Sequence, residues 1–235
     1  MNLLNTYCIT VKDNPISEKG YNECWRSCRS VGNAFYVQKF NASTEDTVKK
    51  EIIDWDLVWN YPWEGKVSCI ATGLIKSAYA TAIKERRMAA AVSHFRLWTE
   101  CFEKKEPILV LEHDALFIKK LDYQYLLDSK YDIIGINNPL GATRRAQAFH
   151  DIIQKNKKEI QPVPTIDEFN IPQGLAGNSA YIIKPSGAEK MIELVFKYGL
   201  WPNDALMCKQ LVDNLGVSKT FYTRVQGLTS TTTQH

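Results

Sequence analysis

ILVLEHDALF, residues 108–117, begins as a buried strand and then presents three ionisable side chains, Glu112, His113 and Asp114, before it becomes apolar again. A charge that is buried without a partner costs roughly several kcal/mol. The strand therefore either ends at Leu111 and reaches the surface, or its acids hold something at the edge of a sheet. Glu112 and Asp114 are two residues apart, so both side chains point to one side if the extended backbone continues.

Strand and helix patterns alternate along the N-terminal half of the chain. TYCITV (6–11) and AFYVQKF (34–40) have the apolar and β-branched content of strands. A helical pattern follows each of them, the first through YNECWRSCRSVG to Gly32 and the second through TVKKEIIDW, opened by Ser43 or Thr44. This order predicts a mixed α/β fold with a mostly parallel central sheet covered by helices.

The segment before residue 108 has a clear helical period. Between Glu85 and Lys105 apolar residues recur at steps of three and four, and Pro107 ends the pattern. A long amphipathic helix is therefore predicted directly before the buried strand. Its apolar face consists of Met88, Ala91, Val92, Phe95, Trp98 and Phe102.

The C-terminal half repeats the same kinds of pattern. Ser186 and Glu189 form an S-x-x-E pattern that predicts a capping box at the start of a helix, which Gly199 ends. Further strands are predicted at YDIIGIN (131–137), SAYIIK (179–184) and KTFYTRVQ (219–226).

Two stretches lack a regular pattern. Residues 56–80 are irregular, and residues 138–173 are polar, with one helical pattern in AQAFHDIIQKNKK. Loop-rich stretches of this length are usually functional or mobile. No repeat or low-complexity linker divides the chain, so we interpret residues 1–235 as one domain.

The composition is that of a globular protein with a substantial core. Of its 235 residues 45% are hydrophobic and 11% aromatic, and the formal charge is 29 − 26 = +3. This mild basic excess tolerates a phosphate-bearing partner without requiring one. The sequence has neither an 18-residue apolar run nor a signal-peptide pattern, which favours a soluble, cytoplasmic protein.

Six cysteines are scattered along the chain without paired spacing. Cys24 and Cys28, four apart in a predicted helix, have a spacing that suits a shared metal, but no second pair accompanies them. Buried thiols in a reducing compartment are the alternative that we favour.

The acid pair suggests chemistry at the end of the strand. In open α/β sheets, ligands bind at the carboxyl ends of the strands. Glu112 and Asp114 are oxygen ligands of the kind that Mg²⁺ and Mn²⁺ prefer, especially when substrate phosphates supply the remaining ligands. The alternative is a solvated turn with ordinary surface acids.

Several stretches, taken in order, resemble glycosyltransferase family 25, which includes bacterial lipooligosaccharide sugar transferases. They are AVSHFRLW, ILVLEHDALF, AYIIKPSGAEKMI, WPNDALM and LTSTTTQ. The resemblance covers nearly the whole chain and is densest at residues 88–117, 174–193 and 201–207. It implies a GT-A-like (Rossmann-like) fold and transfer of a sugar from a nucleotide sugar, UDP-linked, with inversion at the anomeric carbon.

The resemblance also implies a metal site for Mn²⁺ or Mg²⁺. The family has Glu-Asp-Asp where this chain has Glu112-His113-Asp114. Asp114 is then the direct metal ligand, and Glu112 is a second ligand or a contact to the ribose. His113 either points into the fold or acts as an extra ligand. His235, the last residue, either completes the metal shell or belongs to a disordered end.

Asp204 falls at the position of the family's Pro-x-Asp motif. The resemblance makes it the candidate base that deprotonates the acceptor hydroxyl. From its place before ALMCKQLVDNL, it is equally a candidate N-cap for a helix.

Four more residues are candidate substrate contacts. Ser93 and His94 lie beside the apolar stripe of the predicted helix, where a hydrogen-bonded core histidine is common, and the family resemblance implies a donor-site role instead. Arg144 and Arg145 either meet the diphosphate or an acidic acceptor, or form a solvated pair in the 138–173 stretch, which we interpret as an acceptor-side insertion.

The resulting hypothesis is a metal-dependent glycosyltransferase that acts on a saccharide hydroxyl. Sugar transfer to a hydroxymethylated base in viral DNA is an alternative, compatible with Arg144, Arg145 and KNKK (155–158). A non-catalytic module that binds nucleotide sugars is an alternative of another class.

Overall fold

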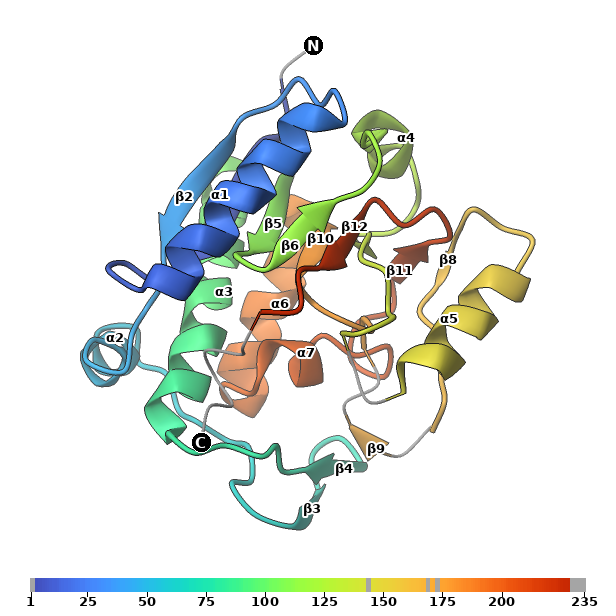
Figure 1. Ribbon diagram of the computed structural model, residues 1–235. Coiled ribbons are helices and arrows are strands. Elements are labelled where there is room, and N and C mark those ends of the chain that lie inside the picture. Colours follow the sequence, from blue (N-terminus) through green and yellow to red (C-terminus); the bar gives the residue numbers. More distant parts are fainter. Residues whose placement is uncertain (1–2, 143–144, 168–169, 172–173, 229–235) are drawn as a thin grey trace.

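The centre of the protein is a twisted sheet in the order β2-β1-β5-β10-β7-β11-β8 (Figure 1). The computed structural model describes residues 3–142, 145–167, 170–171 and 174–228. Within these residues seven strands form the central sheet, with β10 and β8 antiparallel to their neighbours and the other strands parallel. The expected α/β, Rossmann-like fold with a mostly parallel sheet is confirmed. The strands are β1 (Asn5–Thr10), β2 (Val37–Asn41), β5 (Ile108–Glu112), β7 (Ile133–Gly135), β8 (Ile160–Pro162), β10 (Ala180–Ile183) and β11 (Leu215–Ser218).

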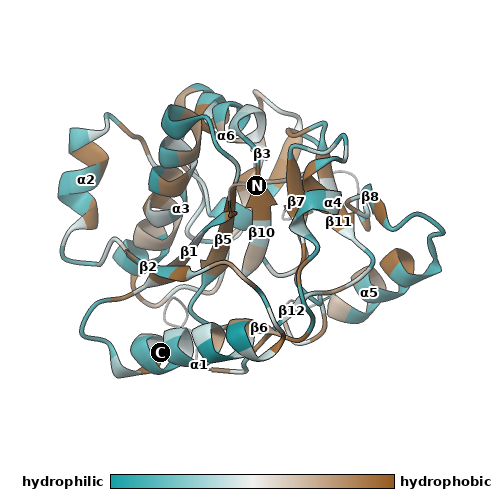
Figure 2. Ribbon diagram, turned by 90° about the horizontal axis from the view of Figure 1, so that it is seen from above, coloured by the Kyte–Doolittle hydropathy of each residue, from teal (hydrophilic) through white to brown (hydrophobic). Residues whose placement is uncertain are grey.

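Helices cover both faces of this sheet (Figure 2). The helices are α1 (Pro15–Ser30), α2 (Val48–Asp54), α3 (Lys84–Lys104), α4 (Tyr123–Leu127), α5 (Ala146–Lys155), α6 (Pro185–Tyr198) and α7 (Asn203–Leu206). Short strands outside the central sheet pair as β3 (Lys66–Cys69) with β4 (Leu74–Ser77), β4 with β9 (Asn170–Ile171), and β6 (Ala115–Phe117) with β12 (Thr223–Val225).

Strand β5 is buried on both faces, as its continuous apolar run predicts. Ile108 and Val110 belong to the core cluster that includes residues of α3 and α6. Leu109 and Leu111 belong to the other cluster, which includes residues of α1, β6 and α4. The acids that follow Leu111 are therefore held at the edge of a sheet whose position both layers fix.

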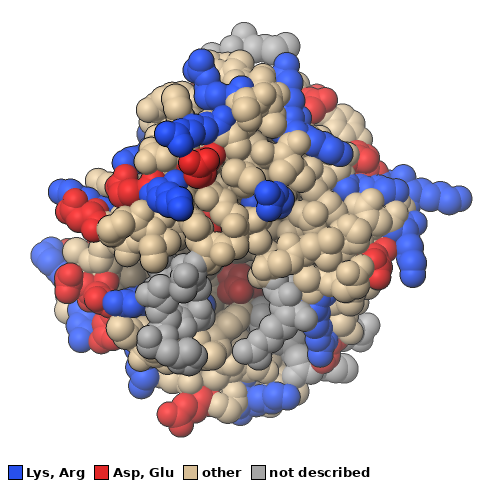
Figure 3. Space-filling model, viewed as in Figure 1, with Lys and Arg blue, Asp and Glu red and all other residues tan. Residues whose placement is uncertain are grey.

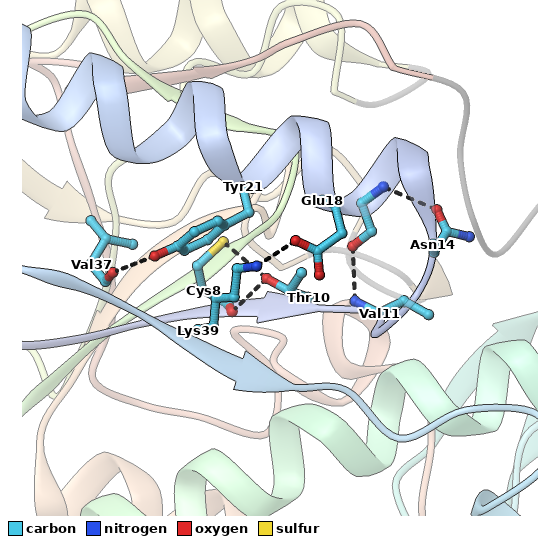
Figure 4. A network of polar contacts seen from close by, with 9 residues as sticks. Cys8, Thr10, Val11, Asn14, Glu18, Tyr21, Val37 and Lys39 are labelled. Atoms are coloured by element: carbon cyan, nitrogen blue, oxygen red, sulfur yellow. Dashed lines mark hydrogen bonds and ion pairs between the residues drawn. The ribbon is translucent and has the colours of Figure 1, made fainter.

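The turn from β1 into α1 explains why α1 begins at Pro15, earlier than its apolar pattern indicated (Figure 4). Asn14 is the N-cap, since its Oδ1 accepts the N–H of Ser17 at 3.0 Å. The Ser17 hydroxyl in turn accepts the N–H of Val11 at 2.8 Å. Proline in the first turn has the φ that a helix needs.

Helix α3 confirms the amphipathic helix predicted before β5, and it ends where Lys105 adopts a left-handed conformation (φ 54°). The capping box at α6 was wrong. Lys184 is the N-cap and Pro185 follows it, while the Ser186 hydroxyl donates to Asp132 Oδ1 at 2.6 Å. Proline has no N–H to be capped at the first helical position, so the helix starts two residues earlier than a capping box at Ser186 predicts.

Three other expectations need correction. Helix α2 begins at Val48 rather than after Ser43 or Thr44. Residues 56–80 contain the β3–β4 pair rather than only irregular chain. The stretch 205–215 does not continue as a helix, because α7 ends at Leu206 and β11 follows. Within 138–173 the predicted helix is present as α5, and β8 adds an edge strand to the central sheet.

Candidate active site

The acidic triplet lies at the carboxyl edge of the central sheet, where β1 and β5 both end. Because β10 runs antiparallel to β5, the start of β10 lies at the same edge. The Glu112 N–H donates to the Ser179 carbonyl at 2.8 Å. Figure 3 shows a hollow with acidic atoms at its floor, on the face seen in Figure 1 and in the region of α7.

A chain of buried hydrogen bonds ends on Glu112. Trp98 Nε1 donates to the Tyr181 hydroxyl at 2.9 Å, which lies 2.8 Å from His94 Nδ1, and His94 Nε2 lies 3.2 Å from Glu112 Oε1. The ionised Glu112 carboxylate can only accept, so His94 carries a proton on Nε2 and donates it to Glu112. In the neutral imidazole Nδ1 is then the acceptor of the tyrosine hydroxyl proton. Burial raises the pKa of Glu112, but the hydrogen bond from His94 and the positive charges around the carboxylate, Arg87 among them, together outweigh burial and lower the pKa.

Replacing Tyr181 by Phe tests this chain. The variant leaves the Trp98 N–H and His94 Nδ1 without their shared partner in a buried site. We expect the free energy of unfolding to fall by about 1–3 kcal/mol. Turnover should fall several-fold, because Tyr181 no longer holds the His94 ring in position to donate to Glu112. Urea unfolding and initial rates measure both effects. Tyr125→Phe, at an exposed tyrosine of α4, is the control. Equal stability and equal rates of the two variants would show that the hydrogen-bond chain does not support Glu112.

The carboxyl group of Asp114 is buried in surroundings that disfavour its charged form. Its Oδ1 is buried and has no hydrogen-bond partner within the described part of the chain. Burial and the nearby Glu112 charge raise the pKa of Asp114 to about 7. A cation at this carboxylate would supply the missing partner and lower that pKa.

His113 packs against α1. A Cβ atom on Gly20 would lie 2.7 Å from the His113 carbonyl oxygen and 3.0 Å from its ring Cδ2, so α1 approaches this closely only because residue 20 is glycine. The contact supports the orientation of His113 into the fold. Burial lowers the pKa of the His113 imidazole, which favours its neutral form.

Gln226, which was not predicted as a site residue, holds the backbone of the acidic triplet in place through hydrogen bonds. Its N–H donates to the Asp114 carbonyl at 2.8 Å. Its side-chain Nε2 lies 2.9 Å from the carbonyl oxygen of Gly20 and 3.1 Å from those of His113 and Ala115. The residue after β12 thereby ties α1 to the acidic turn.

Asp204 lies in the four-residue helix α7, after Pro202 at the N-cap position. The N-cap role was therefore wrong, because Pro202 holds that position and the chain enters the helix before Asp204. Burial raises the pKa of Asp204, and the Arg87 charge and the Tyr79 hydroxyl oppose that rise. The Glu112 charge also raises it, which places Asp204 within electrostatic range of the triplet.

Arg87 and Tyr79 accompany Asp204 and were missed from the sequence. The Arg87 guanidinium carbon lies 5.0 Å from the centroid of the Tyr79 ring. Arg87 Nε is buried and lacks a hydrogen-bond partner among the residues described, whereas the buried Tyr79 hydroxyl lies close enough to Asp204 to lower its pKa. Arg87 is seven residues before His94 on α3, a spacing that puts both on one helix face and offers a signal that could have identified it.

A protein-family model described as glycosyltransferase family 25 (LPS biosynthesis protein) matches residues 70–207. The chain belongs to glycosyltransferase family 25. The matched region contains α3, the triplet after β5, β10 and Asp204. The protein is thus a sugar-transferring enzyme, which requires a sugar donor and an acceptor. A search of curated proteins finds no match.

The remaining candidate site residues of this glycosyltransferase are Ser93, Arg144, Arg145 and His235. Ser93 is fully buried, and its hydroxyl accepts the Ser43 N–H at 2.9 Å and donates to the Ala89 carbonyl at 2.8 Å, so its contacts join parts of the fold. Arg145 is exposed beside α5. Arg144 and His235 lie outside the described residues.

Among the described residues of the glycosyltransferase, no group of three or more His, Cys, Asp or Glu side chains is placed to hold a metal ion. All six cysteines are described, and each is a buried free thiol. In the described part of the chain, no helix has the length and apolar character needed to span a membrane.

Proposed function

We propose that this enzyme transfers a sugar from a UDP-linked nucleotide sugar to a hydroxyl group of a saccharide acceptor, and that Mn²⁺ or Mg²⁺ is its cofactor. The observation that carries the proposal is the buried Oδ1 of Asp114 after β5, which has no hydrogen-bond partner among the described residues. Burial raises the pKa of Asp114 and that of Asp204 in α7. We assign Asp114 to the sugar donor and Asp204 to the acceptor.

The residues at the triplet fit a hard divalent cation. The unpartnered Asp114 Oδ1 is an oxygen ligand that lacks a positive neighbour. Glu112 uses Oε1 for His94, which leaves its second oxygen for a metal or a ribose hydroxyl. Two protein carboxylates are few for a cation, which favours a site completed by donor phosphates. When bound, the cation would offset negative charge that develops on the diphosphate.

The acceptor side follows from Asp204. Its carboxylate takes the proton of the acceptor hydroxyl while the acceptor oxygen bonds to the anomeric carbon of the sugar. The bond from that carbon to the diphosphate oxygen breaks, and its electron pair leaves with the diphosphate. A single displacement of this kind inverts the anomeric configuration. The raised pKa of Asp204 makes it a stronger base than an exposed aspartate, and Arg87 stabilises the carboxylate form that the reaction needs.

The description of the matched family in terms of LPS biosynthesis supports a saccharide acceptor over hydroxymethylated DNA. The acid pair of the triplet, retained beside His113, argues for catalysis rather than a non-catalytic binding module. Six buried free thiols support a reducing compartment, and the cytoplasm is the location that we propose.

A transfer assay tests the proposal. The enzyme is incubated with a panel of UDP-, GDP- and CMP-sugars, Mn²⁺, and either lipopolysaccharide-core saccharides or hydroxymethylated DNA, and products are detected by mass spectrometry. We expect a UDP-sugar and a saccharide to react, and EDTA to stop the reaction. Equal rates in EDTA would contradict the metal. Transfer to DNA alone would contradict the acceptor, and no transfer beside tight nucleotide-sugar binding would favour a binding module.

A further inference from the structure

Residues 174–179, which we call the connecting segment, directly precede β10 in the chain. In space, one end of the segment lies beside α7 and the other end lies beside the end of β5. At one end, a Cβ atom on Gly174 would lie 2.0 Å from the Met207 carbonyl oxygen and 2.9 Å from that of Asp204, so only glycine allows this approach. At the other end, the Ser179 carbonyl accepts the Glu112 N–H. The connecting segment therefore bridges the helix of the candidate base and the strand of the acidic triplet.

Asn178 is the polar residue in this segment whose contacts are unexplained. Its side chain is buried, at 8% exposure, and neither the amide nitrogen nor the amide oxygen has a hydrogen-bond partner in the described ranges of the chain. The same is true of the Ser179 hydroxyl, at 3% exposure. Buried polar groups in proteins are nearly always hydrogen-bonded, so this cluster indicates a partner from outside the described residues.

Asn137, at the same edge of the sheet, provides a contrast. Its Nδ2 donates to the Asn138 carbonyl at 2.9 Å, and its Oδ1 accepts the Thr223 hydroxyl at 3.1 Å. A Cβ atom on Gly177 would lie 2.8 Å from Asn137 Nδ2, so Asn178 follows directly after this contact. The fold therefore gives a partner to each side-chain atom of Asn137 and leaves both side-chain atoms of Asn178 available.

We propose that Asn178, assisted by the Ser179 hydroxyl, binds adjacent hydroxyl groups of the sugar that is transferred. This inference rests on the proposed function, and it adds the residues that recognise the donor sugar. A carboxamide presents a donor and an acceptor side by side, and each hydroxyl of a vicinal diol can accept and donate. A phosphate would leave the amide oxygen unpaired, and a metal ion would leave the amide N–H groups unpaired.

The position of the connecting segment also supports the donor sugar as the ligand. In the proposed reaction the sugar lies between the leaving diphosphate, at Asp114, and the acceptor hydroxyl, at Asp204. The connecting segment contacts both regions, since Gly174 packs against the Asp204 carbonyl and the Ser179 carbonyl pairs with Glu112. We therefore assign the sugar to its buried polar side chains. Hydrogen bonds from a desolvated site discriminate strongly between substrates that supply the partner and those that do not. Asn178 is thus a specificity-determining residue for the donor sugar.

Nucleotide titrations of wild type and Asn178→Ala test the proposal. With Mn²⁺ present, dissociation constants are measured for UDP and for UDP-glucose, UDP-galactose and UDP-N-acetylglucosamine. For the sugar that wild type transfers, we expect the ratio of the UDP-sugar constant to the UDP constant to rise roughly 10- to 100-fold in the variant, as the loss of two hydrogen bonds implies. UDP affinity itself should stay within about twofold.

Thermal unfolding and a matched variant complete the test. Asn178→Ala should unfold near the wild-type temperature, because the side chain it removes has no protein partner in the part of the chain that is described. Asn156→Ala, at an exposed asparagine after α5, should leave every constant unchanged. An unchanged ratio, or equal weakening of UDP and UDP-sugar, would overturn the role of Asn178. If wild type binds no nucleotide in the panel, the proposed function fails, and the inference fails with it.

Discussion

Asp114→Asn is expected to reduce sugar transfer by about 10³-fold, which corresponds to about 4 kcal/mol of lost transition-state stabilisation. The amide has nearly the shape of the carboxyl group but cannot supply the charge that holds a cation against the diphosphate. The fold should survive, because the missing Oδ1 contact is already absent among the described residues. Initial rates of UDP release with Mn²⁺, together with urea unfolding, measure both quantities.

The matched control is Asp213→Asn, which makes the same change at an exposed position after α7. It should retain the wild-type rate. If Asp114→Asn also retains that rate, or if EDTA leaves the wild-type rate unchanged, Asp114 is not a metal ligand. A variant that is inactive because it has unfolded would be recognised by its urea transition.

Asp204→Asn is expected to reduce turnover by about 10²–10⁴-fold, because an amide cannot take the proton of the acceptor hydroxyl. The Michaelis constant for the donor should barely change, since the group acts on the acceptor. Near-normal turnover in a folded Asp204→Asn variant would exclude this carboxylate as the base.

The stability of the same variant should depend on pH in a defined direction. Burial raises the folded-state pKa of Asp204 above its ordinary value of 3.8. Between the unfolded and folded pKa values the native state binds the extra proton, so wild type loses stability as pH rises through this window. Asn does not titrate, so the stability of the variant relative to wild type should increase with pH there. Denaturant unfolding across that range gives the sign.

Local sequence signals predicted the elements nearest the site. The period of α3 and the continuous apolar run of β5 are properties of neighbouring residues, so both elements were found. The predicted helix at 205–215 failed for a long-range reason. Gly174 packs directly on the Met207 carbonyl at the end of α7, and no pattern within 205–215 reveals that contact. The start of α6 failed because Pro185 took precedence over an apparent capping box.

The same difference between local signals and long-range contacts explains which site residues were predicted. Glu112 and Asp114 were found because two acids at the end of an apolar run are visible in the sequence itself. Asn178 was missed, because a buried asparagine acquires significance only when its hydrogen bonds can be counted in three dimensions. Arg87 lies between these cases, since its spacing from His94 was visible but its place beside Tyr79 was not.

The central proposal is that two carboxyl groups have separate roles: Asp114 holds the donor through a cation, and Asp204 acts on the acceptor. Calorimetric titration of UDP with Mn²⁺ into the two Asn variants tests this claim most directly. The account predicts that Asp204→Asn binds with wild-type affinity. Asp114→Asn should lose more than the roughly 10- to 100-fold that follows removal of an outer-shell partner of a metal. Equal affinities in the two variants, or a loss confined to Asp204→Asn, would contradict it.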